Sequence, residues 1–353
     1  MRNRNDVTSE DWKPSCSIAV LHVRAAMLRA VRAFFDARGY LEVETPCLSR
    51  DIVIDAWLEP FELQIGRDRW FLQTSPEAGM KRLLAAGSGS IYQLSRVFRK
   101  NEVGSRHNHE FTMIEWYGVG TNWTDQLKLT EDLTRAAVDA GMQALDSLGK
   151  HSGPSASNSP CWPNKPFAVT TYAEAFRRTL GIDVHAASID ELSNVITQQG
   201  LLFPESDQPV RKDDLLNFLL GMIVEPTLGG SSENEAPEFL CDYPPTQAAL
   251  AALSETEPKV ARRFELYVRG LELCNGYQEL TDAAELQRRD DAQNGTREDE
   301  AKATLPGAPR LNAAMKSGLP QCSGVAMGFD RLVMLALGTS DIRKVLPFPG
   351  ELA

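Results

Sequence analysis

The sequence predicts an α+β domain in which helices flank an antiparallel β-sheet, and three stretches support this prediction. Residues 97–117 have the pattern of a β-hairpin, because two runs rich in β-forming residues enclose a polar loop with Gly104. Residues 322–329 alternate small and apolar side chains, as in a buried strand, and lead into an apolar helix at 331–337. Residues 18–38 carry apolar side chains at helical spacing with arginines between them.

The first elements of the chain are a helix and a short strand. The helix at 18–38 is expected to stop at Gly39, since glycine favours helix ends. A strand at 41–43 then leads to Pro46, whose fixed φ angle and missing donor suit the edge or the end of a strand. Further strands are expected at 57–65, 70–73, 239–243 and 264–268, and helices at 78–86, 123–148, within 171–224 and after Asp282. Residues 290–309 are highly charged and predict a loop.

The chain is expected to form one domain with two flexible parts. Residues 1–16 are polar and predict a flexible tail, followed by the main domain at 17–353. Between 147 and 166 the composition changes sharply to Ser, Pro, Gly and Asn. This change predicts a flexible insertion rather than a domain boundary, because patterned segments resume beyond it.

Composition and charge exclude several classes of protein. The 353 residues include no segment with the apolar length of a membrane span or the apolar centre of a signal peptide, so we expect a cytoplasmic protein. The formal net charge of −11 argues against binding nucleic acid by broad phosphate neutralisation. It suits a small cationic substrate or a basic face on a protein partner. The six cysteines form no CxxC pair, so neither a zinc site nor a disulfide framework is indicated.

The predicted hairpin carries side chains suited to an anionic ligand. Arg99 presents a rigid set of donors to phosphate oxygens, and His107 on the far side of the loop can reach further phosphates. Phe111 offers a face on which a purine ring can stack. These residues predict a nucleotide clamp, although this stretch alone also fits a solvated basic hairpin with a phenylalanine in the core.

Three motifs in order resemble the signatures of class II aminoacyl-tRNA synthetases. They are the segment 39–46, the hairpin 97–117, and the glycine-alternating strand that precedes Arg331. Residues 74–77 (TSPE) and 272–279 (ELCNGYQE) make the match specific. The chain is most similar to the lysyl-tRNA synthetase branch. Within that branch it resembles the family of stand-alone paralogues that attach (R)-β-lysine to a lysine of translation elongation factor P.

The resemblance implies an ATP site, held without a Walker loop, since no GxxxxGK[ST] pattern occurs. As catalytic residues, Arg99 would contact the α-phosphate and Arg331 the γ-phosphate, and adenine would stack on Phe111. Taken alone, Arg331 also fits a solvated residue at the start of a helix. The implied ATP-binding residues are Arg99, Lys100, Asn101, His107, Asn108, Phe111, Glu272, Leu273, Gly328 and Arg331.

The resemblance also implies a magnesium site at Glu265 and Glu272, and carboxylate oxygens are ligands that this hard cation takes. Glu279 follows Glu272 at the same spacing of seven and would face the substrate. Without the family, all three residues would be interpreted as surface carboxylates.

The implied substrate site is acidic and suits a diamine. Its residues are Ser75, Pro76, Glu77, Glu115, Tyr117, Glu279 and Ala326. By resemblance, Glu77 faces the backbone-type amine, while Glu115, Tyr117 and Glu279 surround the side-chain amine of lysine or (R)-β-lysine. Buried carboxylates require cationic partners. The alternative for Glu115 and Tyr117 is that they point outward from a strand.

Ala326 bears on the choice of amino acid. It stands where the synthetase pattern has glycine, and the β-lysine ligases have alanine there. A methyl group at the floor of a pocket can discriminate between substrates by about 1–3 kcal/mol.

The resemblance implies an AMP-forming, ATP-dependent ligase that uses Mg²⁺ and forms a homodimer through the N-terminal helix and strand. It implies no membrane partner, and tRNA is not expected as an acceptor, because the catalytic domain at 17–353 leaves no room for an anticodon-binding domain. Asn101 departs from the family pattern, where an acid is expected, with Glu102 displaced by one, and His109 replaces a proline. Two alternatives remain: a synthetase-like ligase acting on tRNA or a small acceptor, and a catalytically silent regulatory paralogue.

Overall fold

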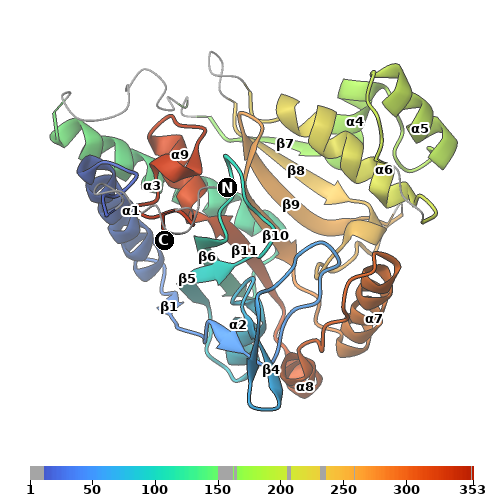
Figure 1. Cartoon of the computed structure of the whole chain (residues 1–353), viewed down its shortest axis with the longest axis horizontal. Coiled ribbons are helices and arrows are strands. Elements are labelled where there is room, and N and C mark those ends of the chain that lie inside the picture. The colour runs from blue at the N-terminus through green and yellow to red at the C-terminus, as the bar shows by residue number, and fades with distance from the viewer. Residues whose placement is uncertain are drawn as a thin grey trace.

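The computed structural model describes residues 12–149, 162, 165–204, 208–230, 236–257, 259–350 and 352–353 (Figure 1). At its centre, these residues form an eight-stranded sheet in the order β1-β5-β6-β11-β10-β9-β8-β7. The strands are β1 (Leu41–Glu42), β5 (Ile91–Phe98), β6 (Glu110–Val119), β7 (Ala168–Thr171), β8 (Glu238–Tyr243), β9 (Ala261–Val268), β10 (Leu271–Gln278) and β11 (Cys322–Gly328).

The central strands of this sheet run antiparallel, as the sequence predicts. The pairs at the two edges, β1 with β5 and β7 with β8, are parallel, so the sheet as a whole is mixed. Strands β5 and β6 form the predicted hairpin, with Phe98 paired to Glu110 near its closed end. β11 pairs with β6 on one side and β10 on the other, and this places the two predicted ligand-binding stretches side by side.

The two faces of the central strands have different surroundings, because side chains alternate along a strand. Trp116 of β6 and Met327 of β11 are buried in the largest core, against helices on one face (Figure 1). These helices are α1 (Ile18–Asp36), α3 (Trp123–Ser147) and α9 (Phe329–Ala336). Glu115 and Ala326, which are register partners on β6 and β11, point to the opposite face.

Further helices and a small sheet surround this opposite face. The helices are α2 (Glu77–Ala85), α4 (Tyr172–Leu180), α5 (Ile189–Gln198), α6 (Lys212–Leu219), α7 (Ala283–Asp299) and α8 (Pro309–Gly318), with short helical turns at Leu220–Val224, Glu225–Thr227, Pro245–Gln247 and Ile342–Lys344. Helices α4, α5 and α6 pack with β8 and β9 in a second core, and α2, α7 and α8 share a third. The small sheet has the order β2-β4-β3, formed by Leu48–Ser49, Asp68–Leu72 and Glu62–Ile65.

The prediction of a loop at 290–309 was wrong for residues 290–299, because α7 continues to Asp299, and is confirmed for residues 300–308, which precede α8 at Pro309. Asp282 caps α7 by accepting the amides of Ala284 and Glu285. Within α7, the fully buried Arg297 forms an ion pair with Glu59 (2.7 Å). The polar sequence of α7 shows no apolar face, so contacts with distant residues stabilise this helix.

The strand predicted at 57–65 begins only at Glu62. The carboxylate of Asp55 accepts the amides of Trp57 and Leu58 and turns the chain there. This side-chain bond to the backbone competes with strand pairing.

The last residues of the segment expected to be a flexible tail pack against the domain. The Ser15 hydroxyl donates to the carbonyl of Leu346 (2.7 Å), and Cys16 is buried. The remainder of that expected tail, 1–11, and most of the predicted insertion, 150–161 with 163–164, lie outside the described residues. The described cysteines are free thiols, and no described helix has the length and apolarity needed to span a membrane.

A buried ion pair joins the first helix to the end of the central sheet. Arg24 of α1 donates to Asp330 of α9 at 2.5 Å, and both side chains are at most a tenth exposed. The other oxygen of Asp330 accepts the backbone amide of Thr112 on β6 (2.7 Å). Asp330 therefore ties α9, which carries Arg331, to the residue of β6 that follows Phe111.

Candidate active site

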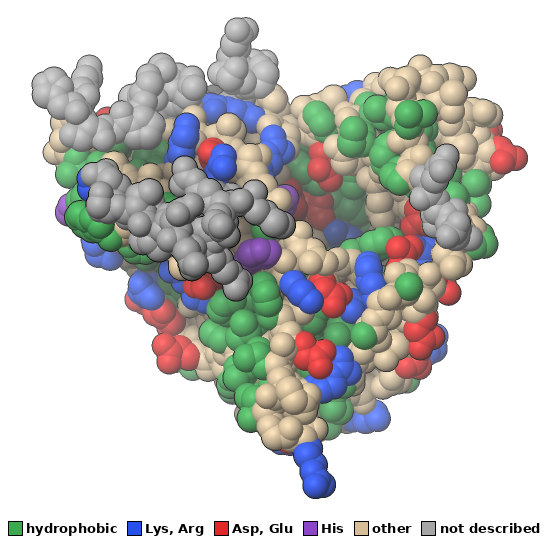
Figure 2. All heavy atoms as spheres, in the orientation of Figure 1, with side chains coloured by type: hydrophobic (Ala, Val, Ile, Leu, Met, Phe, Trp, Pro, Cys, Tyr) green, Lys and Arg blue, Asp and Glu red, His purple; other side chains and the backbone are tan. Residues whose placement is uncertain are grey.

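The central sheet forms the floor of a cavity of about 890 Å³. Figure 2 shows a hollow at this place, with acidic and basic side chains gathered around it. Most of the residues predicted from sequence line this one cavity: Ser75, Glu77, Arg99, His107, Asn108, Phe111, Glu115, Tyr117, Glu265, Glu272, Leu273, Glu279, Ala326, Gly328 and Arg331. Pro76, Lys100 and Asn101 do not line it.

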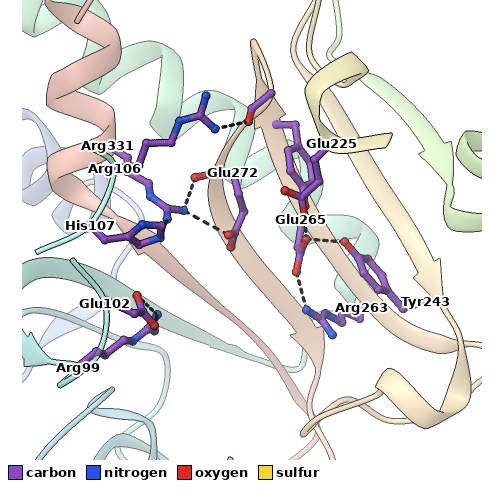
Figure 3. A network of polar contacts seen from close by, with 12 residues as sticks. Arg99, Glu102, Arg106, His107, Glu225, Tyr243, Arg263, Glu265, Glu272 and Arg331 are labelled. Atoms are coloured by element: carbon purple, nitrogen blue, oxygen red, sulfur yellow. Dashed lines mark hydrogen bonds and ion pairs between the residues drawn. The ribbon is translucent and has the colours of Figure 1, made fainter. Parts of the chain in front are cut away.

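The two predicted arginines line the same cavity, each beside a carboxylate (Figure 3). Arg331 forms an ion pair with Glu272, with 3.2 Å between Nη1 and Oε2, and also donates to the Glu272 carbonyl at 2.6 Å. Arg99 pairs with Glu102, with 3.3 Å between Nη1 and Oε1. Each guanidinium that is expected to hold phosphate therefore already has a carboxylate partner.

His107 lies directly beside Arg331. Its Nε2 is 2.9 Å from the Nη2 of Arg331. Burial, and then the charge of Arg331, lower the pKa of His107, so the ring is neutral and accepts from the guanidinium. The loop that carries His107 is narrowed by a backbone bridge between His107 and Gly104.

Phe111 and Arg99 lie next to each other on the hairpin. The Arg99 guanidinium lies 5.1 Å from the centre of the Phe111 ring. The Arg99 amide donates to the carbonyl of His109 at 2.9 Å, so the histidine that replaces the family's proline still closes the hairpin. Glu102, displaced by one position in sequence, supplies a carboxylate inside the cavity, while Asn101 is exposed outside it.

The other end of the cavity holds three carboxylates, those of Glu77, Glu115 and Glu279. Glu115 is 1% exposed and accepts from the hydroxyls of Ser75 (2.5 Å) and Tyr117 (2.9 Å). Burial, and then the charge of Glu77, raise the pKa of Glu115 to about 8. Burial likewise raises the pKa of Glu279 to about 7. Without a ligand, this end of the cavity therefore holds at least one proton near neutral pH.

Two small residues of β11 shape this acidic end. A Cβ atom on Gly324 would lie 2.4 Å from Oε1 of Glu279 and 2.4 Å from the Tyr117 ring, so only glycine leaves these groups in place. Ala326 is paired in register with Glu115 on β6 and with Asn275 on β10. Its methyl group therefore sits on the cavity floor between two polar side chains.

Glu265 belongs to a separate network on β9 (Figure 3). It pairs with Arg263 (2.5 Å) and accepts from the hydroxyls of Tyr243 (2.5 Å) and Tyr267 (2.6 Å). Tyr267 also donates to Glu225 at 3.2 Å. Burial, and then the charges of Glu265 and Glu272, raise the pKa of Glu225 to about 7.

This concentration of negative charge fits an oxygen-liganded cation. Glu265 and Glu272 lie on the adjacent strands β9 and β10, and carboxylate oxygens are ligands that Mg²⁺ takes. Among the residues that the structure describes, no three His, Cys, Asp or Glu side chains are grouped closely enough to hold a metal ion by themselves.

Sequence reasoning missed several residues of the site. Arg263 carried a usable signal, since it stands just before the predicted strand 264–268, two positions before Glu265, and so shares its face if the strand begins earlier, as β9 does. Arg106, in the hairpin loop, lines the cavity and donates to the carbonyl of Gly270 (2.9 Å). Lys81 could not be predicted, because no pattern in the neighbouring sequence indicates that a lysine of a short helix is buried.

Comparison with known proteins identifies the family of this chain. The family model described as class II tRNA synthetases (D, K and N) matches residues 10–352. The elongation factor P–(R)-β-lysine ligase of Pseudoalteromonas translucida (strain TAC 125) is 40% identical over 343 residues, which cover 96% of this chain and 97% of that protein. The ligase of the same name from Vibrio cholerae is 41% identical over 352 residues, or 97% of this chain and 99% of that protein.

These matches agree with the geometry of the cavity, where the two arginines and the acidic end are grouped over the central sheet. The three class II motifs identified from sequence lie on β1, on the hairpin of β5 and β6, and on β11, which are consecutive neighbours in one sheet. This chain therefore belongs to the class II tRNA synthetase family of the D, K and N type, in the branch that contains the elongation factor P–(R)-β-lysine ligases.

Proposed function

We propose that this protein is an ATP-dependent ligase that activates (R)-β-lysine, or lysine, and transfers it to a lysine ε-amine of elongation factor P. The observation that carries the proposal is the convergence in one cavity of two arginines and three carboxylates. The arginines suit a triphosphate, and the carboxylates suit a substrate with two ammonium groups.

In the first step, the carboxylate of the amino acid attacks the α-phosphorus of ATP. A P–O bond forms, pyrophosphate leaves, and an aminoacyl-adenylate results. Arg99 would stabilise the charge that develops on the α-phosphate, and Arg331 with His107 would hold the outer phosphates. No protein nucleophile is needed, because the site acts by positioning and by charge.

ATP binding would exchange the partners of Arg331. In the structure this guanidinium is paired with Glu272. Phosphate oxygens would take over the guanidinium and release the carboxylate. Glu272 and Glu265 would then hold Mg²⁺, which supplies charge neutralisation between the phosphates when bound.

At the acidic end, Glu77 would bind the amine closer to the carboxylate of the substrate. Glu115 and Glu279 would bind the distal amine, with Tyr117 holding Glu115 in place. A monoamine would leave a buried carboxylate without a cation, and this cost favours diamino acids.

In the second step, the neutral ε-amine of the acceptor lysine attacks the carbonyl carbon of the adenylate. An amide bond forms, AMP leaves, and the amine loses a proton.

The protein would act as a homodimer through α1 and the edge strand β1, where Ile18 and Leu41 are exposed apolar side chains.

The decisive experiment measures the intact mass of elongation factor P after incubation with the protein, ATP and each lysine isomer. We expect the mass to rise by one lysyl group, most completely with (R)-β-lysine. A parallel reaction offers tRNA as the acceptor. Unmodified elongation factor P together with charged tRNA would replace the proposal with a synthetase-like activity.

Replacing Ala326 with glycine should shift preference from (R)-β-lysine toward α-lysine. Removing the methyl group deepens the floor beside Glu115, and an effect of about 1–3 kcal/mol corresponds to roughly 5-fold to 150-fold in the ratio of kcat/KM values. Pyrophosphate exchange with both isomers measures this ratio. An unchanged ratio would remove Ala326 from the choice of substrate.

The KM for the diamino acid should rise by roughly tenfold or more as the pH falls from about 8.5 to about 6.5. The raised pKa values of Glu115 and Glu279 mean that both carboxyls gain protons in this range, and an ammonium group binds the ionised form. The groups that act on Glu115 are Ser75, Glu77, Lys81 and Tyr117. The variant Glu115→Gln should have a flatter profile. An equally steep profile in that variant would assign the pH dependence to other groups.

A further inference from the structure

Lys81 is a buried cation that the steps above do not use. It lies one helical turn after Glu77 on α2 and is 2% exposed. Its ammonium group contacts Oε1 of Glu77 and lies 2.6 Å from Oε2 of Glu279. Both partners line the cavity, whereas Lys81 does not. The lysine therefore stands behind the two carboxylates and cannot reach a ligand itself.

The two oxygens of Glu279 have different surroundings. Oε2 lies against Lys81, while Oε1 lies over β11, in the space left by the missing side chain of Gly324. Gly324 itself lines the cavity. Because Lys81 holds Oε2 of Glu279 from outside the cavity, Oε1 of the same carboxylate points toward the place where a ligand would lie.

Lys81 also sets the charge of this end of the cavity. Burial by itself lowers the pKa of the ammonium group, but the carboxylates of Glu279 and Glu77 outweigh burial and raise it above its usual value, so Lys81 stays charged. When a bound diamine keeps Glu115 ionised as well, three carboxylates and one ammonium group leave two negative charges. Two negative charges match the two ammonium groups of a diamino acid.

We propose that Lys81 is a positioning residue of the amino-acid site, which holds Glu77 and Glu279 together so that their free oxygens bind the substrate's amines and only two negative charges remain. The inference rests on the proposed function of this cavity. It differs from a purely structural ion pair, which would stabilise the packing of α2 without affecting how an amine binds.

The test is pyrophosphate exchange by Lys81→Met, a substitution that keeps most of the length of the side chain and removes its charge. We expect the KM for (R)-β-lysine to rise by at least about tenfold and the KM for ATP to stay within about twofold. The pH at which the KM begins to rise should also move upward, because two carboxylates lose their cation. The matched control is Arg82→Met, which removes an exposed cation from the next position of α2 and should match the wild type.

A folded Lys81→Met protein with a KM for (R)-β-lysine within about twofold of the wild type would overturn the proposal. Should this variant fail to fold, Lys81→Arg decides. It keeps the charge but displaces the carboxylates, so the KM should rise by at least about fivefold, and an unchanged value would overturn the positioning role.

The wild-type protein separates this inference from the proposed function. Exchange with no amino acid at all would reject the ligase itself. Normal exchange by the wild type, together with an unchanged KM in the variants, would reject only the role of Lys81.

Discussion

Replacing Arg331 with alanine is expected to lower kcat/KM for pyrophosphate exchange by at least about 10²–10³-fold. The substitution removes a guanidinium that would stabilise the outer phosphates, and it leaves Glu272 as an uncompensated carboxylate next to the triphosphate. Both changes oppose the binding of a polyanion. The measurement is exchange at saturating amino acid, with kcat and KM for ATP determined separately.

The matched control is Arg69→Ala. Arg69 also pairs with a glutamate, Glu62 at 2.7 Å, but it lies on the small sheet and outside the cavity. This variant should exchange as the wild type does, and both proteins should unfold at similar temperatures. Exchange retained by Arg331→Ala would show that the nucleotide does not bind between the two arginines.

Replacing Asp330 with alanine is expected to destabilise the protein by about 3–5 kcal/mol. Arg24 would be left buried without its partner, and the amide of Thr112 would lose its acceptor. Denaturant unfolding followed by circular dichroism measures the change. A loss below about 1 kcal/mol would show that water replaces the missing carboxylate.

The double variant Arg24→Met/Asp330→Ala is the control for this mechanism. It removes both charges, so the penalty for an unpaired buried cation disappears, and part of the stability should return. Recovery should be incomplete, because the Thr112 amide still lacks an acceptor. No recovery at all would mean that the loss comes from packing rather than from charge.

The central sheet could be predicted from sequence because its signals are local. Alternation along 322–328 and the β-forming residues of 111–117 indicate two strands, and the loop with Gly104 indicates the hairpin between β5 and β6. The convergence of Arg99 and Arg331 followed from family motifs and not from spacing. Their common cavity depends on β11 pairing with β6 across more than half of the chain.

What could not be predicted depends on contacts between distant residues. Helix α7 buries little apolar surface and is held partly by Arg297, whose partner Glu59 lies far away in sequence. In the same way, the pairing of Lys81 with Glu279 exists only after α2 has docked beside the end of β10. Local patterns report the periodicity of an element, but they carry no information about its neighbours.

The pairing of Arg331 with Glu272, and of Arg99 with Glu102, has a consequence for competition among cellular anions. Inorganic phosphate could engage one guanidinium at a time, and it would have to separate that guanidinium from its glutamate for a single new contact. A nucleoside triphosphate would bind both guanidinium groups in one event and displace both glutamates. Displacing the second glutamate would then cost no further translational entropy, because the ligand is already bound. The paired arginines would thus favour a chelating ligand over free phosphate, although each arginine alone discriminates poorly between them.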